Sequence, residues 1–169
     1  MSRGLNRKPV LYIGVLIALV GILASACSAT EPTPYSVHSL DNAYQEGNFK
    51  QVIQEADYLV NLGPSSTQYA EARLYRGLAE LCKEGNTELA KANLAVAEGL
   101  SSNLETIDQD YELTLLYRGQ MVVNLHTGNI PAAEQYYKQA LQLSPDMQEV
   151  IMQEYVSGYL SNVVQTASR

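Results

Sequence analysis

Few side chains in this 169-residue chain are of the types that perform catalysis or bind metals, since it holds only two cysteines and two histidines. His38 and His126 are distant in sequence, and neither has a second ligand at the short spacing that metal sites use. Asp108 and Asp110 resemble part of a calcium loop but lack its glycine and distal glutamate. Because negative charge is favourable at a helix start, they are predicted to cap a helix beginning near Tyr111. We expect no metal and no cofactor.

Motifs of common enzymes are also absent from the sequence. There is no phosphate-binding Gly-Lys-Ser/Thr loop, no Gly-x-Ser-x-Gly nucleophile elbow and no HExxH zinc motif. No His or Asn pattern accompanies Cys82 that would make its thiol a nucleophile, so Cys82 is predicted to be a small hydrophobic residue on an apolar helix face. The sequence therefore predicts a non-catalytic protein.

Charge is distributed unevenly along the chain, whose net charge is −7. Three basic residues (Arg3, Arg7 and Lys8) precede an uncharged segment, and every acidic residue follows it. From Cys27 onward there are eight basic and 18 acidic residues, a net charge of −10. We expect no binding to nucleic acid, because phosphate binding requires a basic face, and no unaided docking on anionic lipid.

The first 26 residues are typical of a secretory signal. Residues 10–26 carry no charge, and as a helix they would span about 25 Å of a hydrocarbon core about 30 Å thick. Their small-residue exit is Leu23-Ala24-Ser25-Ala26-Cys27. This exit resembles a bacterial lipobox, which implies cleavage before Cys27 and lipidation of that cysteine. It departs from the lipobox pattern at Ala24, where leucine is usual.

Two alternatives stay open for this segment. Ala24-Ser25-Ala26 also fits ordinary signal peptidase, which would release a soluble protein, and an uncleaved segment 10–26 would remain as a membrane anchor. The Ser, Thr and Pro residues that follow Cys27 are typical of a spacer, which predicts a tether at 27–35. We expect the protein on the extracytoplasmic face of a bacterial cell envelope, held at the membrane by lipid on Cys27 or by residues 10–26.

The rest of the chain has helical periodicity and no strand pattern, which predicts an all-α fold. A turn signal occurs three times, as Glu46-Gly47-Asn48, Glu84-Gly85-Asn86 and Thr127-Gly128-Asn129. Glycine suits the left-handed position that ends a helix, and asparagine suits the cap of the next helix. Helices are predicted near 36–46, 49–62, 67–84, 87–99, 107–127, 130–143 and 146–164.

The residues after each turn glycine share a register. At five, nine, twelve and seventeen residues on are Val52, Ala90 and Ala133; Ala56, Leu94 and Tyr137; Leu59, Ala97 and Ala140; and Pro64, Ser102 and Pro145. The pattern resembles the tetratricopeptide repeat family, which implies an α-solenoid of about three helix pairs over residues 36–145. It departs from the family in glycine spacings of 38 and 43 residues instead of 34, and in the absence of tryptophan. A generic helical bundle is the alternative.

Residues 146–169 are predicted to be a capping helix and a C-terminal tail, because a repeat stack needs an element that covers its open apolar end. The expected capping stripe is Met147, Ile151, Tyr155 and Tyr159, widened by Val156, Leu160, Val163 and Val164. The breadth of this stripe keeps a homodimerisation helix open as the alternative.

The tetratricopeptide resemblance also implies a concave groove, lined by the first helix of each pair, in which members of the family bind proteins or peptides. Mapped by register, the partner-binding residues are Asp41, Tyr44, Gln45, Tyr75, Lys83, Arg118, Asn124 and His126. The third unit keeps a one-residue ambiguity, with Tyr117 or Arg118 and Met121 or Val122 facing inward. We expect a non-catalytic interaction scaffold. A self-associating structural protein and a small-ligand binder in the groove are the alternatives.

Overall fold

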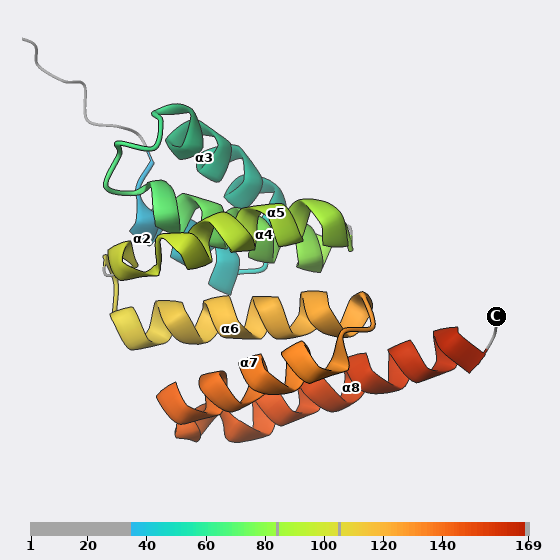
Figure 1. The fold of residues 1–169 in the computed structure, drawn as a ribbon. Helices are drawn as coiled ribbons and strands as arrows, with labels where there is room; N and C mark the ends of the chain where they lie inside the picture. Colours follow the sequence, from blue (N-terminus) through green and yellow to red (C-terminus); the bar gives the residue numbers. More distant parts are fainter. Residues whose placement is uncertain (1–34, 84, 105, 168–169) are drawn as a thin grey trace, which may run out of the picture. The chain divides into compact units, whose positions relative to one another are not determined.

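The computed structural model describes residues 35–83, 85–104 and 106–167, and this part is all-helical with no strand. The predicted signal segment, the lipidation site Cys27 and nearly all of the tether lie outside the described residues. The α-helices are α2 (Val37–Gln45), α3 (Phe49–Asn61), α4 (Tyr69–Lys83), α5 (Thr87–Gly99), α6 (Gln109–His126), α7 (Ile130–Leu143) and α8 (Gln148–Ala167). Two short 3-10 helices, η1 (Ser101–Asn103) and η2 (Pro145–Met147), precede α6 and α8 (Figure 1). The seven helices predicted from periodicity agree with these bounds to within a few residues.

The folded part of the chain includes Tyr35, the last residue of the predicted tether. Tyr35, assigned to the tether, packs edge-on against Tyr58 of α3, with ring centroids 5.3 Å apart. The hydroxyl of Ser36 accepts a hydrogen bond from the Ser39 backbone N–H at 3.2 Å and caps α2. Tyr35 is therefore part of the folded helical unit.

Tight turns join α2 to α3, α4 to α5 and α6 to α7. The glycine of each turn has positive φ, as predicted: Gly47, Gly85 and Gly128. The side chains of Asn48 and Asn86 accept hydrogen bonds from the backbone N–H three residues on, at 3.3 and 3.2 Å. The prediction is wrong for Asn129, whose side chain makes no cap and instead donates to Asn124 Oδ1 at 3.1 Å. Asp108 caps α6 as expected, accepting from the Tyr111 backbone N–H at 2.9 Å.

Successive helices pack against one another along the chain. Each turn brings two helices together, and α3 packs on α4 while α5 packs on α6. The alternate helices also touch, with α2 on α4, α4 on α6 and α6 on α8. Figure 1 shows α6 between the α4 and α5 helices on one side and α7 and α8 on the other. The helices α2, α4, α6 and α8 therefore contact one another in order.

The small residues of the repeated register lie at helix contacts. The positions five and twelve residues after each turn glycine are fully buried: Val52, Ala90, Ala133, Leu59, Ala97 and Ala140. Small side chains at these points let two helix backbones approach, because a larger side chain would meet the facing helix. Four of these six buried residues are alanines.

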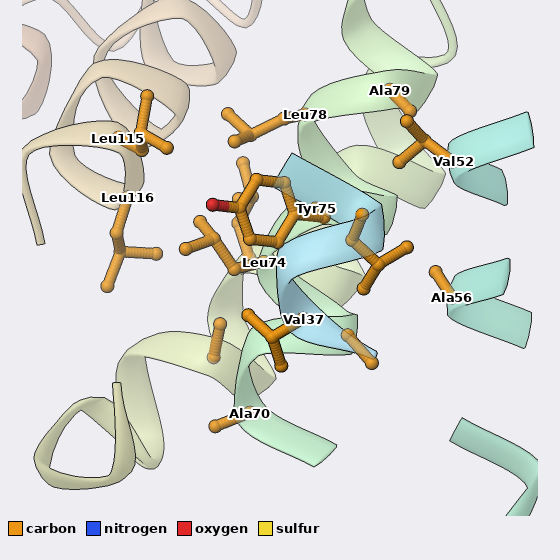
Figure 2. Packing of buried hydrophobic residues seen from close by; sticks show 14 of the residues in the cluster. Val37, Val52, Ala56, Ala70, Leu74, Tyr75, Leu78, Ala79, Leu115 and Leu116 are labelled. Carbon is orange, nitrogen blue, oxygen red and sulfur yellow. The ribbon is translucent and has the colours of Figure 1, made fainter. Parts of the chain in front are cut away.

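The apolar interior forms two clusters. The larger one spans α2 to α6 and surrounds Tyr75, which Figure 2 shows close to Leu74, Leu78 and the α6 residues Leu115 and Leu116. The smaller cluster joins α6, α7 and α8, and its buried residues are Met121, Leu125, Ala133, Ala140 and Ile151. Burial of each large apolar side chain stabilises the fold by about 1.5–3 kcal/mol.

Helix α8 packs on α6 and α7 with only part of the predicted stripe. Ile151 is fully buried and Tyr155 is half-buried, but Tyr159 is 41% exposed and Leu160 is 57% exposed. The backbone of α8 approaches α6 instead at Gly158, where an added Cβ would lie 2.7 Å from a Leu125 methyl carbon. The prediction that the whole stripe caps the fold is wrong, because only Met147, Ile151 and Tyr155 are buried or half-buried and its other members are exposed.

In the described part of the chain, no helix combines the length and the apolar content needed to cross a membrane.

Candidate functional site

A pocket of about 130 Å³ opens between the alternate helices α2, α4, α6 and α8. Its lining residues are Tyr44, Leu78, Leu81, Cys82, Leu115, Arg118, Gly119, Val122 and Glu154. We call it the interhelical pocket. Most of these side chains are apolar, and the charged ones sit together at one side as a single ion pair. Such a pocket fits an uncharged side chain with a polar group beside it.

The α2 side of the pocket is held by a hydrogen-bond network under its surface. Asp41 Oδ1 accepts hydrogen bonds from the hydroxyls of Tyr75 and Tyr111, each at 2.9 Å. The Gln45 amide donates to the Tyr111 hydroxyl. Burial and the Asp41 carboxylate raise the pKa of Tyr111 to about 12, so this hydroxyl stays a neutral donor in the physiological range. The network joins α2, α4 and α6 and leaves the ring of Tyr44 facing the pocket.

Tyr44 itself is fixed by aromatic contacts. Its ring meets Phe49 and Tyr75 in edge-on geometry, both at 5.9 Å between centroids. Edge-on pairs of this kind contribute about 0.5–1.5 kcal/mol beyond the area they bury. The ring is therefore a rigid wall of the pocket, because moving it breaks two aromatic pairs.

The opposite side of the pocket is an ion pair between α6 and α8. Arg118 donates through Nε and Nη2 to the two oxygens of Glu154, at 2.9 and 2.5 Å. The Arg118 side chain is 16% exposed and that of Glu154 is 35% exposed. Two parallel bonds in a half-buried place fix both side chains and hold the middle of α8 against α6.

Cys82, predicted to lie on an apolar helix face, lines the pocket together with Leu78 and Leu81 but is exposed and not part of the core. The pKa of the Cys82 thiol is raised by partial burial of its sulfur and by the charge of the Glu154 carboxylate. A hydrogen bond with the Tyr44 hydroxyl opposes this rise. A raised pKa keeps the sulfur protonated and lowers its nucleophilicity. The chemical character of this thiol does not suggest covalent chemistry.

The predicted partner-binding residues fall into three groups. Tyr44 and Arg118 line the pocket, and Asp41 and Gln45 lie in the network on its α2 side. Tyr75 is fully buried, so its ring belongs to the core and cannot contact a partner. The prediction for Tyr75 as a partner-binding residue is therefore wrong, and its hydroxyl donates instead to Asp41 within the protein.

The remaining predicted residues are not among those that line the pocket. Lys83 is exposed near the end of α4. The Asn124 amide bonds to the Gln120 carbonyl at 2.8 Å, and His126 lies 3.4 Å from the Thr87 hydroxyl at the exposed end of α6. These three side chains are not brought together with Tyr44 and Arg118.

The structure also resolves the register of the third helix pair. Arg118 and Val122 line the pocket, whereas Met121 is fully buried and Tyr117 packs against Tyr136 at 6.1 Å between centroids. Sequence reasoning missed Tyr111, because a tyrosine near a helix start carries no signal for a bond to α2. It also missed Glu154, whose pairing with Arg118 depends on where α8 lies. The apolar lining at Leu78 and Leu81 follows helical spacing and could have been found.

Two further carboxylates are buried apart from the pocket. Glu71 of α4 and Glu112 of α6 are both fully buried. The Thr106 hydroxyl donates to one oxygen of Glu71 at 2.6 Å, while the other oxygen of Glu71 has no hydrogen-bond partner. Burial, followed by the charges of Glu71 and Asp41, raises the pKa of Glu112 to about 7, although the nearby backbone N–H groups of Ile107 and Thr106 oppose the rise. Neither oxygen of Glu112 accepts a well-formed hydrogen bond. Across the described ranges no three His, Cys, Asp or Glu side chains gather closely enough to bind a metal ion.

No protein-family model, curated protein or solved structure matches this chain.

Proposed function

We propose that this protein is a membrane-anchored, extracytoplasmic scaffold of the tetratricopeptide type, which binds a segment of a partner protein in the interhelical pocket and has no catalytic activity. The observation that carries the proposal is the pocket itself. Alternate helices of one chain supply an apolar concavity, with a fixed tyrosine on one side and a fixed ion pair on the other.

The solenoid assignment draws its support from the register of small residues. Equivalent positions after each turn glycine are fully buried in all three helix pairs, and α2, α4, α6 and α8 contact one another in order. In a tetratricopeptide stack the first helix of each pair occupies this place and lines the groove. The proposal therefore assigns α2, α4 and α6 as groove-lining helices.

The chemistry of the pocket favours a peptide segment with an apolar side chain. Leu78, Leu115 and Val122 offer apolar contacts, and Arg118 and Glu154 offer hydrogen bonds to a peptide group beside them. A pocket of about 130 Å³ is small compared with the 300–1,000 Å³ typical of small-molecule sites. This size favours one inserted side chain over the small-ligand alternative.

Anchoring remains part of the proposal, on the sequence of the first 27 residues. The lipobox-like exit before Cys27 and the spacer after it would place the helical unit at the outer side of a membrane. The scaffold would then act on partners of the cell envelope, in assembly, secretion or cell-wall systems.

The test is a pull-down of the tagged full chain from detergent-solubilised native envelope, followed by mass spectrometry of the bait and of what it captures. A stoichiometric partner, with a bait that starts at lipidated Cys27, is the expected result. A bait captured alone or only with itself would refute the scaffold function.

Two variants at one position then test the pocket. Cys82 is exposed at its mouth, so Cys82→Trp should fill the opening without disturbing the core and should release the partner. Cys82→Ser keeps the size of the side chain and should retain the partner. Equal capture by the tryptophan and serine variants would show that the partner binds elsewhere.

A further inference from the structure

The outer face of α8 is the main exposed apolar surface of the described chain. The described part of the chain has ten exposed large hydrophobic residues, and seven of them belong to α8. They are Val150, Met152, Val156, Tyr159, Leu160, Val163 and Val164. Single exposed apolar residues are ordinary on a protein surface, but a contiguous group on one helix marks an interaction site.

Five of these residues lie on a face of α8 that the other described helices do not cover. Ile151, Tyr155 and Gly158 face α6 and α7, where Ile151 is fully buried. At 100° per residue, a second stripe is centred about 120° around the helix from the first, with Tyr159 at its edge beside Tyr155. We call it the outer stripe; its members are Met152, Val156, Tyr159, Leu160 and Val163, which are 41–57% exposed.

Charge argues that the outer stripe is built for a copy of this same chain. No residue from Tyr155 to Ala167 is charged, although the chain from Cys27 onward has a net charge of −10. Two acidic molecules repel one another, so a neutral contact surface is what their association requires. Helices that lie on lipid surfaces instead carry Lys and Arg on their polar face, and α8 has neither over residues 148–167.

The size of the stripe suits a second copy as well. From the exposed fractions, the five residues of the outer stripe offer roughly 450 Å² of surface. Two such stripes would together bury about 900 Å², which is the size of a small, reversible interface. A capping helix normally has a polar outer face for solubility, so an apolar one indicates that something covers it.

The spacing of the stripe selects an orientation. Met152, Val156, Tyr159 and Val163 are separated by four, three and four residues, an order that is the same in both directions. The four-three alternation is the spacing of a coiled-coil seam. In an antiparallel pair with two-fold symmetry, Val156 of one copy would face Tyr159 of the other, and Met152 would face Val163.

We infer that α8 forms an antiparallel, two-fold symmetric helix pair with α8 of a second copy through the outer stripe. The protein is then a homodimer whose interface lies on a different face of α8 from Glu154, which lines the interhelical pocket. The dimer is independent of any partner in that pocket, and its presence or absence does not decide the proposed function.

Cysteine cross-linking of the full chain in its native membranes tests the pairing. Two differently tagged copies are co-expressed, one with Val156→Cys and the other with Tyr159→Cys, and a mild oxidant is added. Val150→Cys in both copies is the matched control, because Val150 is 47% exposed against 48% for Val156 and lies off the stripe. The native chain measures any background from Cys27 and Cys82.

A disulfide-linked dimer that carries both tags is expected from the Val156 and Tyr159 pair, with at least tenfold less from the Val150 pair and from the native chain. Equal yields from the two cysteine pairs would mean random collision and would overturn the inference. So would the absence of the linked dimer, or capture of a different protein by the Val156→Cys chain.

A charge substitution provides a second measurement that needs no cysteine. Val156→Glu should lower amine cross-linking between copies at least tenfold, whereas Val150→Glu should leave it unchanged. Both positions are about half exposed, so neither substitution should affect folding. An undiminished dimer with Val156→Glu would also overturn the inference.

Discussion

Replacing Glu112 by glutamine should stabilise the protein above neutral pH. Glu112 is fully buried and its oxygens accept no well-formed hydrogen bond. Burial and the charges of Glu71 and Asp41 raise its pKa to about 7, and the nearby backbone N–H groups of Ile107 and Thr106 offset only part of this rise. Between its ordinary pKa of 4.5 and the raised value, the folded state binds a proton that the unfolded state has lost. The free energy of unfolding that depends on this group therefore decreases as pH rises through this window.

The magnitude follows from the shift. A rise from 4.5 to about 7 corresponds to about 3 kcal/mol, at about 1.4 kcal/mol per pKa unit. This cost is absent near pH 4 and complete near pH 8. Glutamine has nearly the same shape and cannot ionise, so Glu112→Gln should remove the cost at high pH and change stability little at low pH.

The assay is urea denaturation of the full chain in mild detergent, followed by helical circular dichroism at pH 5 and pH 8. We expect the variant to gain about 2–3 kcal/mol more over the native chain at pH 8 than at pH 5, because a small part of the cost is already present at pH 5. Comparing the two chains at each pH cancels the other titrating groups and the detergent. The same difference at both pH values would refute the reasoning about Glu112.

Glu55 is the matched control, because it is also buried but both of its oxygens accept hydrogen bonds. The Ser39 hydroxyl donates to one oxygen at 2.6 Å and the Gln51 amide to the other at 2.7 Å. Glu55→Gln turns one acceptor into a donor and should destabilise the protein by about 1–2 kcal/mol. The two substitutions, chemically identical, should thus have opposite signs at pH 8.

Three further predictions concern the helical framework. Ala133→Leu should overpack the contact between α6 and α7, where Ala133 is fully buried, and cost about 1–3 kcal/mol in thermal unfolding; an unchanged melting temperature would contradict the register of small residues. Gly85→Ala should cost about 1–2 kcal/mol because φ there is +60° and no neighbour crowds the site, whereas Gly99→Ala, equally uncrowded and without positive φ, should not destabilise. Arg118→Ala should leave Glu154 unpaired, cost about 1–2 kcal/mol and speed amide hydrogen exchange in α8 relative to α5; equal exchange would show that the ion pair does not hold α8.

The helices could be predicted from the sequence because their signals are local. A turn glycine, a capping side chain and 3.6-residue periodicity act within a few residues of the helix they define. Asp108 illustrates this, since its cap depends only on the residue three positions on. Asn129 shows where local prediction fails, because its side chain donates to Asn124 and does not cap α7.

The candidate site could be predicted only in part. Tyr44 and Arg118 were found from helical register, since the face a residue occupies is set by its own helix. The prediction for Tyr75 was wrong because one face of a helix can be buried or exposed, depending on which helices pack on it. Here residues of α2 and α6 pack around the Tyr75 ring. Lys83, Asn124 and His126 do not line the pocket, and the Asn124 amide is bonded instead to the Gln120 carbonyl of its own helix.

By itself the sequence determined that this part of the chain is helical, where its helices turn and which small residues pack between them. Those properties follow from backbone preference and periodicity, which depend on near neighbours. Tertiary structure alone decided which apolar stripe of α8 is buried, which carboxylates lose their hydrogen bonds, and which side chains meet around the interhelical pocket. The physical reason is that burial and pairing depend on contacts between residues up to 70 positions apart, as between Asp41 and Tyr111, and no local pattern encodes them.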